Sequence, residues 1–428
     1  SLNISKFDTR NVRNMSGMFD ECLALKVLNV SHFITNQVTD ISRMFRYCQN
    51  VQLLDTKSFN TEKVTNMSKL FQNCKVASGI DVSNFNTKLV LDMSYMFEEC
   101  QKTSRINVSL FDTSNVINMR NMFKYTSVSS LDLSNFETSK VEDMSQMFMY
   151  TNNLKVLNIS NFDTSNVKNM SSMFEHAYSI KTLDLGKLNT SKVEDMSYMF
   201  KECSSIKYLN VSSFDTSNVY DMYEIFYKCI GLEELDVRNF KTSKVKDMNS
   251  MFYDIHFVPY LDLSNFDTSL VTDMASMFQN SYSLTSLDVS NFKTNNLRYC
   301  SHMFEGLSRL TSLDVTNFDT SNIEDFSYMF RGLGQLTSLD LSNFNTKKAT
   351  NMSYLFSDSF NLKTIIIDSF DTSLVEDMKY MFYRCWEMKE LNVRNFKTPE
   401  LMDMTYMFGM CKALTSLDLS SFNTPKLK

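Results

Sequence analysis

A run of carboxylates that recurs at a fixed interval is the feature of this sequence most able to do chemistry. Five aspartates, each between two aliphatic residues, are spaced 26 residues apart: Asp236, Asp262, Asp288, Asp314 and Asp340. On neighbouring strands they would place like charges opposite one another, which is destabilising unless something compensates. The run could recruit a cation, or the basic or polyhydroxylated groups of a partner. Alternatively, each carboxylate accepts hydrogen bonds from nearby backbone, Ser or Asn groups and only keeps the surface soluble.

Two irregular loops add candidate binding residues. The loop 253–260 contains His256, Phe257 and Tyr260, whereas the corresponding loop of most copies is polar. The only tryptophan, Trp386, lies in an equivalent loop beside Cys385. Aromatic residues on a surface often carry binding energy. Drift between repeats would explain these departures as well.

The other reactive residue types form no catalytic or metal-binding pattern. Eight of the nine cysteines recur at one position of a repeat, at intervals of 26 residues or multiples of about 26, which matches no zinc-site spacing. The four histidines, His32, His176, His256 and His302, form no pair at ligand spacing. No phosphate-binding loop or nucleophile elbow is present. We therefore expect no enzyme activity, no metal and no cofactor.

Bulk properties exclude further classes of function. The net charge of −6 gives no basic surface for nucleic acid. No run of 18 apolar residues is present, so we expect no membrane span. The chain begins and ends inside a repeat, which predicts a fragment lacking both caps, with any anchor outside it.

The elements that must position these residues come from an internal repeat. Phenylalanine recurs from Phe7 to Phe422 in steps of 26 residues, with one step of 25, from Phe111 to Phe136. A second phenylalanine recurs once per repeat from Phe19 to Phe408. These two columns hold 32 of the 35 phenylalanines, and two methionine columns hold 26 of the 30 methionines. The unusual composition is therefore the repeat itself, in which these side chains form a core.

Two hydrophobic periods alternate within one repeat. Leu28 and Val30 alternate with polar residues, which predicts a short strand with one buried face. Val38, Ile41, Phe45 and Cys48 then recur at intervals of three and four, which predicts a helix. A threonine at one position of every copy, such as Thr35, is placed to cap that helix.

Stacked repeats would complete a core that no single repeat can form. Strands lie about 4.8 Å apart, whereas helix axes need about 8–10 Å. That difference predicts an α/β, curved, leucine-rich-repeat-like solenoid of about 16 strand–turn–helix units, with parallel strands on the inner face. Residues 1–428 are predicted to form one continuous solenoid.

The repeat resembles a known family. The run from Leu310 to Phe318 resembles a leucine-rich repeat with Phe where Asn is usual, and the unit 161–174 is similar to the BspA-like 26-residue repeat of bacterial surface proteins. The resemblance covers essentially the whole chain. It implies a cell-surface or extracellular protein of the mycoplasma and firmicute lipoprotein type, with a role in adhesion or host interaction. The family brings no catalytic residues.

Two non-enzymatic functions follow from the sequence. The first is a surface module that binds a protein or glycan ligand on its concave face. The second is a structural or antigenic spacer without a defined ligand. A binding module predicts that residue differences between copies gather on one face, whereas a spacer predicts that they scatter over all exposed positions.

Overall fold

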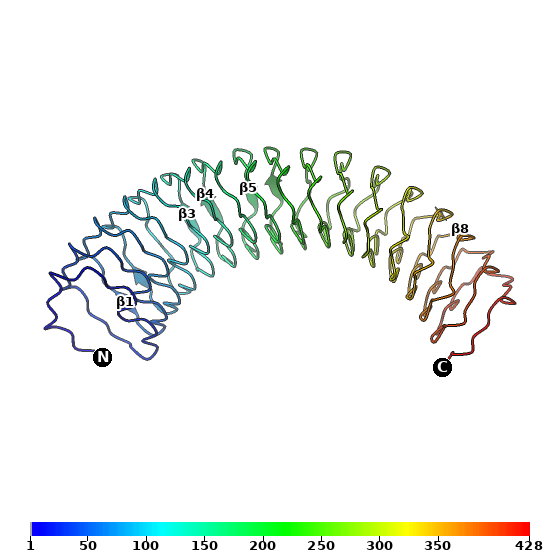
Figure 1. Ribbon diagram of the computed structural model, residues 1–428, viewed down its shortest axis with the longest axis horizontal. Coiled ribbons are helices and arrows are strands. Elements are labelled where there is room, and N and C mark those ends of the chain that lie inside the picture. Colours follow the sequence, from blue (N-terminus) through cyan, green and yellow to red (C-terminus); the bar gives the residue numbers. More distant parts are fainter. Residues whose placement is uncertain (1) are drawn as a thin grey trace. The chain divides into compact units, whose positions relative to one another are not determined.

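The computed structural model describes residues 2–428, and it consists of successive coils, one for each repeat (Figure 1). The chain divides into two compact units, one that ends at Ile206 and one of Lys207–Lys428. Within each unit, neighbouring coils run parallel and are joined by rows of backbone hydrogen bonds. The core lies inside each coil and contains the two phenylalanine columns and the methionine columns.

Short strands occupy the positions that the sequence predicts. Their bounds are β1 Leu53–Leu54, β2 Gly79–Ile80, β3 Ser130–Asp132, β4 Val156–Asn158, β5 Thr182–Asp184, β6 Tyr208–Asn210, β7 Ser338–Asp340 and β8 Thr364–Ile366. In the first unit β1 pairs with β2 and β3 with β4, and in the second unit β7 pairs with β8. All three pairs are parallel, and in β3, β4, β7 and β8, which have three residues each, the central residue is buried or half-buried.

The predicted helices are wrong. Residues 2–428 contain no helix, and the segment with the helical spacing forms consecutive turns instead. In one such segment the Met251 N–H donates to the Met248 carbonyl, three residues back, and the Tyr253 N–H donates to the Ser250 carbonyl. Successive turns bury residues three and four apart, as a helix does, so the hydrophobic pattern did not separate the two.

What replaces each helix is a ladder of hydrogen bonds to the next coil. We call this eight-residue stretch, such as 247–254, the Met–Phe segment. Alternate N–H groups donate to carbonyls of the following coil: Met248 to Asp273 at 3.0 Å, Ser250 to Ala275 at 2.9 Å, Phe252 to Met277 at 2.9 Å and Asp254 to Gln279 at 2.8 Å. All four bonds point the same way along the unit. A helix would have consumed these N–H groups internally.

The ladder depends on an uncommon backbone conformation. Two residues in every Met–Phe segment, such as Ser250 and Asp254, have φ near +60°. Across the described chain 29 non-glycine residues adopt it, and only three glycines do: Gly17, Gly306 and Gly332. The left-handed region costs a non-glycine residue about 1–2 kcal/mol. The inter-coil hydrogen bonds must offset that cost in every coil.

The threonine column links neighbouring coils rather than capping helices, which corrects the sequence-based role. The buried Thr268 hydroxyl donates to the Lys293 carbonyl at 3.0 Å, and the Lys293 N–H donates back to the same oxygen at 2.7 Å. The same arrangement recurs from Thr9 to Thr398. Each threonine therefore satisfies one buried donor and one buried acceptor of the next coil.

Cysteines of the repeat column have a similar structural role. The Cys48 thiol donates to the Phe19 carbonyl of the preceding coil at 3.3 Å, and the Cys203 thiol donates to the Phe174 carbonyl at 3.0 Å. Burial raises the pKa of both thiols to about 12. All nine cysteines are free. These groups are therefore neutral core residues with little nucleophilic character.

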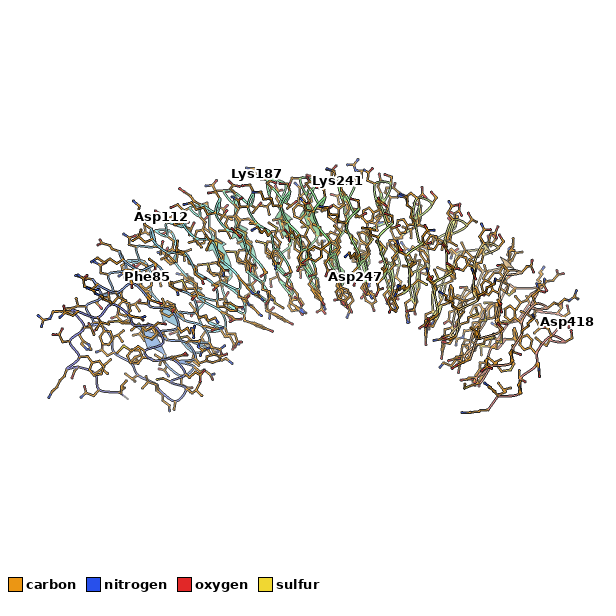
Figure 2. All side chains as sticks on the ribbon, viewed as in Figure 1. Phe85, Asp112, Lys187, Lys241, Asp247 and Asp418 are labelled. Carbon is orange, nitrogen blue, oxygen red and sulfur yellow. The ribbon has the colours of Figure 1, made fainter. Side chains whose placement is uncertain are left out.

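Neighbouring coils are farther apart at the first phenylalanine column than at the second, which accounts for curvature within the second unit. Ring centroids lie 6.4 Å apart for Phe214 and Phe240 in the first phenylalanine column but 5.8 Å apart for Phe226 and Phe252 in the second. Figure 2 shows Lys241 at the convex edge of this unit and Asp247 at its concave edge. The segment predicted as an outer helix thus begins at the inner edge, so its predicted outer position does not hold here.

The threonine links give a direct test of what holds the coils together. Replacing Thr268 with Val should destabilise the second unit by about 2–4 kcal/mol, because each buried group left unpaired costs about 1–3 kcal/mol. The measurement is urea unfolding together with hydrogen exchange of the Lys293 amide. Thr268→Ser keeps the hydroxyl and should retain most of the stability. Slow exchange of that amide in the valine variant would contradict the assignment.

Glycine with positive φ gives a second test. At Gly306 a Cβ would lie 2.7 Å from Asn280 Oδ1 and 3.3 Å from Asn280 Cα, with φ at +76°. Gly306→Ala should therefore cost about 1–2 kcal/mol or more from backbone strain and crowding. Gly79→Ala is the matched control, since its φ is ordinary and the nearest atom is Leu53 Cδ1 at 3.6 Å. Equal melting temperatures for the two variants would show that positive φ carries no strain here.

Candidate functional site

The candidate site lies on the outward side of the strand positions in the second unit, which we call the strand face. It consists of two columns of side chains that flank the buried leucines. One holds the predicted aspartates from Asp236 to Asp340, and the other holds Tyr260, Ser286, Ser312 and Ser338. Four of the five predicted aspartates are exposed, and Asp262 is half-buried.

Each predicted aspartate accepts a hydrogen bond from the residue two positions later. Asp262 Oδ1 accepts from the Ser264 N–H at 3.1 Å and from its hydroxyl at 2.6 Å, and Asp288 repeats this with Ser290. The corresponding backbone bonds of Asp314 and Asp340 are 3.0 and 2.9 Å long. These are Asx turns, which redirect the chain after the strand. One carboxylate oxygen of each residue is therefore engaged in a turn, which is the structural role that the sequence left open as the alternative to binding.

The same hydrogen bonds keep the carboxylates charged. Those from Ser264 and Ser290 hold the pKa values of Asp262 and Asp288 below their usual range, and Thr316 and Ser342 lower those of Asp314 and Asp340. Asp236 differs, because the Arg238 guanidinium binds it at 2.8 Å and lowers its pKa. The unneutralised negative charge of the strand face is therefore carried by Asp262 and the aspartates that follow it in the column.

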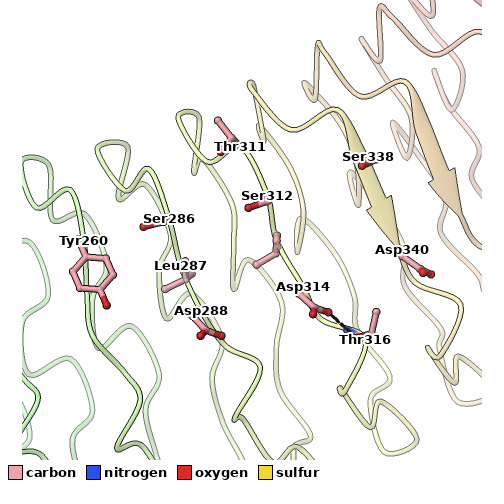
Figure 3. A pocket seen from close by; sticks show the side chains of 11 residues that line it. Tyr260, Ser286, Leu287, Asp288, Thr311, Ser312, Asp314, Thr316, Ser338 and Asp340 are labelled. Carbon is pink, nitrogen blue, oxygen red and sulfur yellow. Dashed lines mark hydrogen bonds between the residues drawn. The ribbon is translucent and has the colours of Figure 1, made fainter.

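Two grooves open on this face and meet at one residue. A groove of about 600 Å³ contains Asp288, Asp314 and Asp340 together with the serine column (Figure 3). A second, of about 650 Å³, contains Asp236, Asp262 and Arg238. Tyr260, with 55% of its surface exposed, lines both.

The grooves coincide with a stretch in which strand pairing is not formed. Between residues 260–263 and 286–289, the described chain has no backbone hydrogen bond from one coil to the next. By contrast, β7 and β8 pair in register. Backbone polar groups of this stretch thus have no partner in the neighbouring coil, and they are candidate donors and acceptors for a ligand.

The structure does not bring the other predicted residues to these grooves. His256 Nε2 lies 2.6 Å from Asp254 Oδ1, and its ring is 5.1 Å from that of Tyr282. Phe257 is 62% exposed but lines neither groove. Of the loop 253–260, only Tyr260 and the adjoining Pro259 belong to the candidate site.

Trp386 belongs to a separate packing cluster. Its ring lies 4.3 Å from that of Phe360, and the Lys412 ammonium lies 4.0 Å from its centre. Its Nε1 is buried without a hydrogen-bond partner in the described chain. The tryptophan is half-buried between neighbouring coils. These contacts account for it as a packing residue.

A second acidic row follows the start of the Met–Phe segments. In the first unit aspartate and asparagine alternate in this row, but in the second unit Asp221, Asp247 and Asp273 follow one another and form bridges between coils. Burial, with added repulsion from Asp273 and Asp221, raises the pKa of Asp247 to about 6. The alternation of aspartate and asparagine in the first unit therefore avoids the repulsion that the three adjacent carboxylates create in the second.

The described residues contain neither a metal-ligand cluster nor a membrane-spanning helix. Within residues 2–428, no three His, Cys, Asp or Glu side chains are grouped closely enough to hold a metal ion. That part of the chain also contains no helix of the length and hydrophobicity needed to cross a bilayer. The strand-face carboxylates thus form a row rather than a coordination cluster.

Parallel short strands, buried leucines and a repeated coil define a protein of the leucine-rich-repeat class. Family models identify it further: the model described as "Mycoplasma protein of unknown function, DUF285" matches in eight overlapping segments that together cover residues 1–428. The chain belongs to this family. The match confirms the resemblance to bacterial 26-residue surface repeats. A search of curated proteins finds no match.

One of three similar solved structures supports the fold assignment. A leucine-rich repeat protein from Bacteroides ovatus is 14% identical, with 89% of this chain and 86% of that chain covered and a TM-score of 0.51. An internalin from Listeria monocytogenes is 16% identical, with 76% and 83% covered and a TM-score of 0.25. A leucine-rich cell surface protein from Faecalibacterium prausnitzii is 14% identical, with 95% and 77% covered and a TM-score of 0.25. At these identities the Bacteroides ovatus structure shows the fold alone.

Sequence reasoning missed several residues of the candidate site. Arg238, which neutralises Asp236, and the serines Ser286, Ser312 and Ser338 line the grooves beside the predicted residues. The serines could have been found, because they hold the second outward position of the same strands. The pairing of Asp236 with Arg238 has a weaker signal in the sequence. It consists of two residues of opposite charge that lie on the same side at the end of a strand.

The raised pKa of Asp247 predicts a pH dependence. A carboxyl that titrates at higher pH when folded binds more protons than the unfolded chain, so stability falls as pH rises from about 4 through 6. Asp247→Asn keeps the acceptor oxygen and should remove that fall, with a gain of about 1–2 kcal/mol at pH 7, less than the full shift allows because Asp247 is only half-buried. Urea unfolding from pH 4 to 8 measures it.

Asp92→Asn is the matched control, because its neighbours in the row are Asn66 and Asn118. That variant should keep the pH dependence of the unaltered protein. A stability profile for Asp247→Asn that parallels that of the unaltered protein would show that the pKa of Asp247 is not raised in the folded protein.

Proposed function

We propose that this chain is a non-enzymatic, cell-surface repeat array over residues 1–428 that binds a partner through the strand face of its second unit. The observation that carries the proposal is the pair of grooves joined at Tyr260, in a stretch where strand pairing is absent. Binding proteins on repeat scaffolds use such extended surfaces. Adhesion to a host or to another cell is the role that fits this surface.

The charge on the face favours a protein partner with exposed lysine or arginine. Asp262, Asp288 and Asp314 each have one oxygen in a turn and no hydrogen bond from the described residues to the other. A guanidinium or ammonium group could bind these free oxygens with a charge-assisted hydrogen bond. Such contacts mainly set association rate and specificity.

A spacer without a defined ligand is the second candidate. The observation that favours it is that every predicted aspartate already makes an Asx turn. If turns alone maintain this column, asparagine should serve as well as aspartate, and it does occur in this column at Asn210 and Asn392. The run of five aspartates supports the binding proposal instead.

The two candidates differ in the effect of removing charge. The variant Asp262→Asn, Asp288→Asn, Asp314→Asn keeps the acceptor oxygen of each turn but removes three charges. It should bind at least tenfold more weakly, since three lost charge contacts of about 0.5 kcal/mol each suffice. Binding is measured against immobilised extracellular-matrix proteins and glycans, with and without calcium and at two salt concentrations.

The matched control is Asp267→Asn, Asp319→Asn, Asp371→Asn. These aspartates make the same turn with a serine two residues later, but they follow the first phenylalanine column and line neither groove. The control should bind normally. Equal binding by both triple variants would rule out the acidic face, and no binding to any component with or without calcium would favour the spacer.

A further inference from the structure

A gap interrupts one row of backbone hydrogen bonds between coils of the second unit. The backbone row just before the Met–Phe segments is continuous on both sides: the Arg298 N–H donates to the Thr272 carbonyl at 2.9 Å, and the Thr350 N–H to the Glu324 carbonyl at 2.8 Å. Among the described residues of this unit, the bond from the Glu324 N–H to the Arg298 carbonyl is the one missing from that row.

The neighbouring row is broken at the same place. The Met274 N–H donates to the Tyr299 carbonyl at 2.9 Å, but the Cys300 N–H has no partner, and no bridge joins Tyr299 to Asp325 in the described chain. Two residues further on the ladder is closed again, since the His302 N–H donates to the Ser327 carbonyl at 3.0 Å. The opening is therefore local.

The sequence explains why the coils separate here. Where the other coils have Asp or Asn, this coil has Tyr299, and where most of them have Met it has Cys300. Asp273 Oδ1 accepts the Ala275 N–H at 2.8 Å, a turn that a tyrosine side chain cannot make. The shorter Cys300 side chain reaches the Asp325 carbonyl only at 4.0 Å.

A cavity of about 560 Å³ occupies this opening. Its walls are formed by residues of four successive coils, and it shares none of them with the strand-face grooves: Thr272, Asn296, Arg298, Tyr299, Asn322, Glu324, Asp325 and Lys348. The volume falls within the roughly 300–1,000 Å³ of sites that hold small ligands. The cavity is therefore a distinct site, large enough for one or two sugar rings.

Tyr299 offers an aromatic face that the stacked tyrosines Tyr328, Tyr354 and Tyr380 of this unit do not. It is 59% exposed and stacks on no other ring of the described chain. Tyr354, in the nearby tyrosine row, is covered on both faces by Tyr328 at 4.5 Å and Tyr380 at 4.7 Å. A free ring face beside polar groups suits a ligand that is apolar on one side and polar at its rim.

The polar groups of the cavity are mixed and balanced in charge. Arg298 and Lys348 carry positive charge, and Glu324 and Asp325 carry an equal negative charge. The amides of Asn296 and Asn322 add both donors and acceptors. Lys348 is held in place by Asn322 Oδ1 at 2.9 Å. With no net charge, the site does not favour a strong anion or cation.

We infer that this cavity binds a neutral saccharide. A pyranose ring has an apolar C–H face for Tyr299 and a rim of hydroxyls, each both donor and acceptor, for the amides, charged groups and unpaired backbone groups. An extended peptide would need a longer run of open backbone, and the ladder closes two residues away. The inference goes beyond the proposed function, because it concerns a separate site and a different ligand class.

The probe is a printed array of neutral and acidic oligosaccharides, followed by saturation-transfer NMR and calorimetry with each neutral sugar that binds. Tyr299→Ala should weaken binding at least tenfold, and Tyr299→Asn, which restores a common residue type of the row without adding a carboxylate between Asp273 and Asp325, should do the same while the fold is kept. Tyr282→Ala is the control, since that tyrosine is 41% exposed and outside the cavity. It should bind as the unaltered protein does.

Hydrogen exchange provides a second readout. The amides of Glu324 and Cys300 should exchange faster than those of Thr350 and Met274, and a bound sugar should slow them. The inference is overturned if no neutral sugar binds, if only acidic glycans or peptides bind, or if Tyr299→Ala binds as well as the unaltered protein. The strand-face triple variant should keep its sugar binding, so failure of the proposed function is distinguishable from failure of this one.

Discussion

Hydrogen bonds between successive Met–Phe segments are the interaction on which the rest of this structure depends. Each segment gives its alternate N–H groups to the following coil, as Phe252 does to Met277. This requires a left-handed residue at two positions per coil, a conformation that side chains such as Tyr and Glu adopt only at a cost of about 1–2 kcal/mol each. The buried phenylalanine columns and threonine links stabilise the same contact. Stability is therefore shared between neighbouring coils, and it cannot be assigned to a single coil.

This arrangement separates residues that hold the coils from residues free to bind. Positions that point into a coil are mostly occupied by Phe, Met, Leu, Val, Ile, Ala and Cys, and by small polar residues that reach a neighbouring carbonyl. Outward strand positions have no such restriction, so a run of aspartates, a tyrosine or an isoleucine can stand there, as at Asp314, Tyr260 and Ile366. The candidate sites arise at these permissive positions or where a restricted one is violated, as at Tyr299. Both depend on an otherwise regular scaffold.

The repeat, the strands and the buried columns could be predicted from the sequence because each follows from a fixed interval. The turns could not, since Val38, Ile41 and Cys48 have the spacing of a helix, and only a bond to another coil distinguishes the two. The role of threonine was missed for the same reason: its partners lie 25 residues away. Of the candidate site, the aspartates and Tyr260 were foreseen, whereas the gap beside Tyr299 is visible in the sequence only as a residue out of pattern.

The uniform direction of the ladder has a consequence for how such arrays can change length. Every regular coil offers donors to its successor and acceptors to its predecessor, so any coil can follow any other in the same orientation. Duplicating or deleting a whole repeat preserves every partner. The step of 25 residues between Phe111 and Phe136 shows that one residue can also be lost, since the Phe123 N–H still reaches the Met147 carbonyl. Recombination within the gene could therefore lengthen or shorten the array, and move a site such as that of Tyr299 along it, without a new fold.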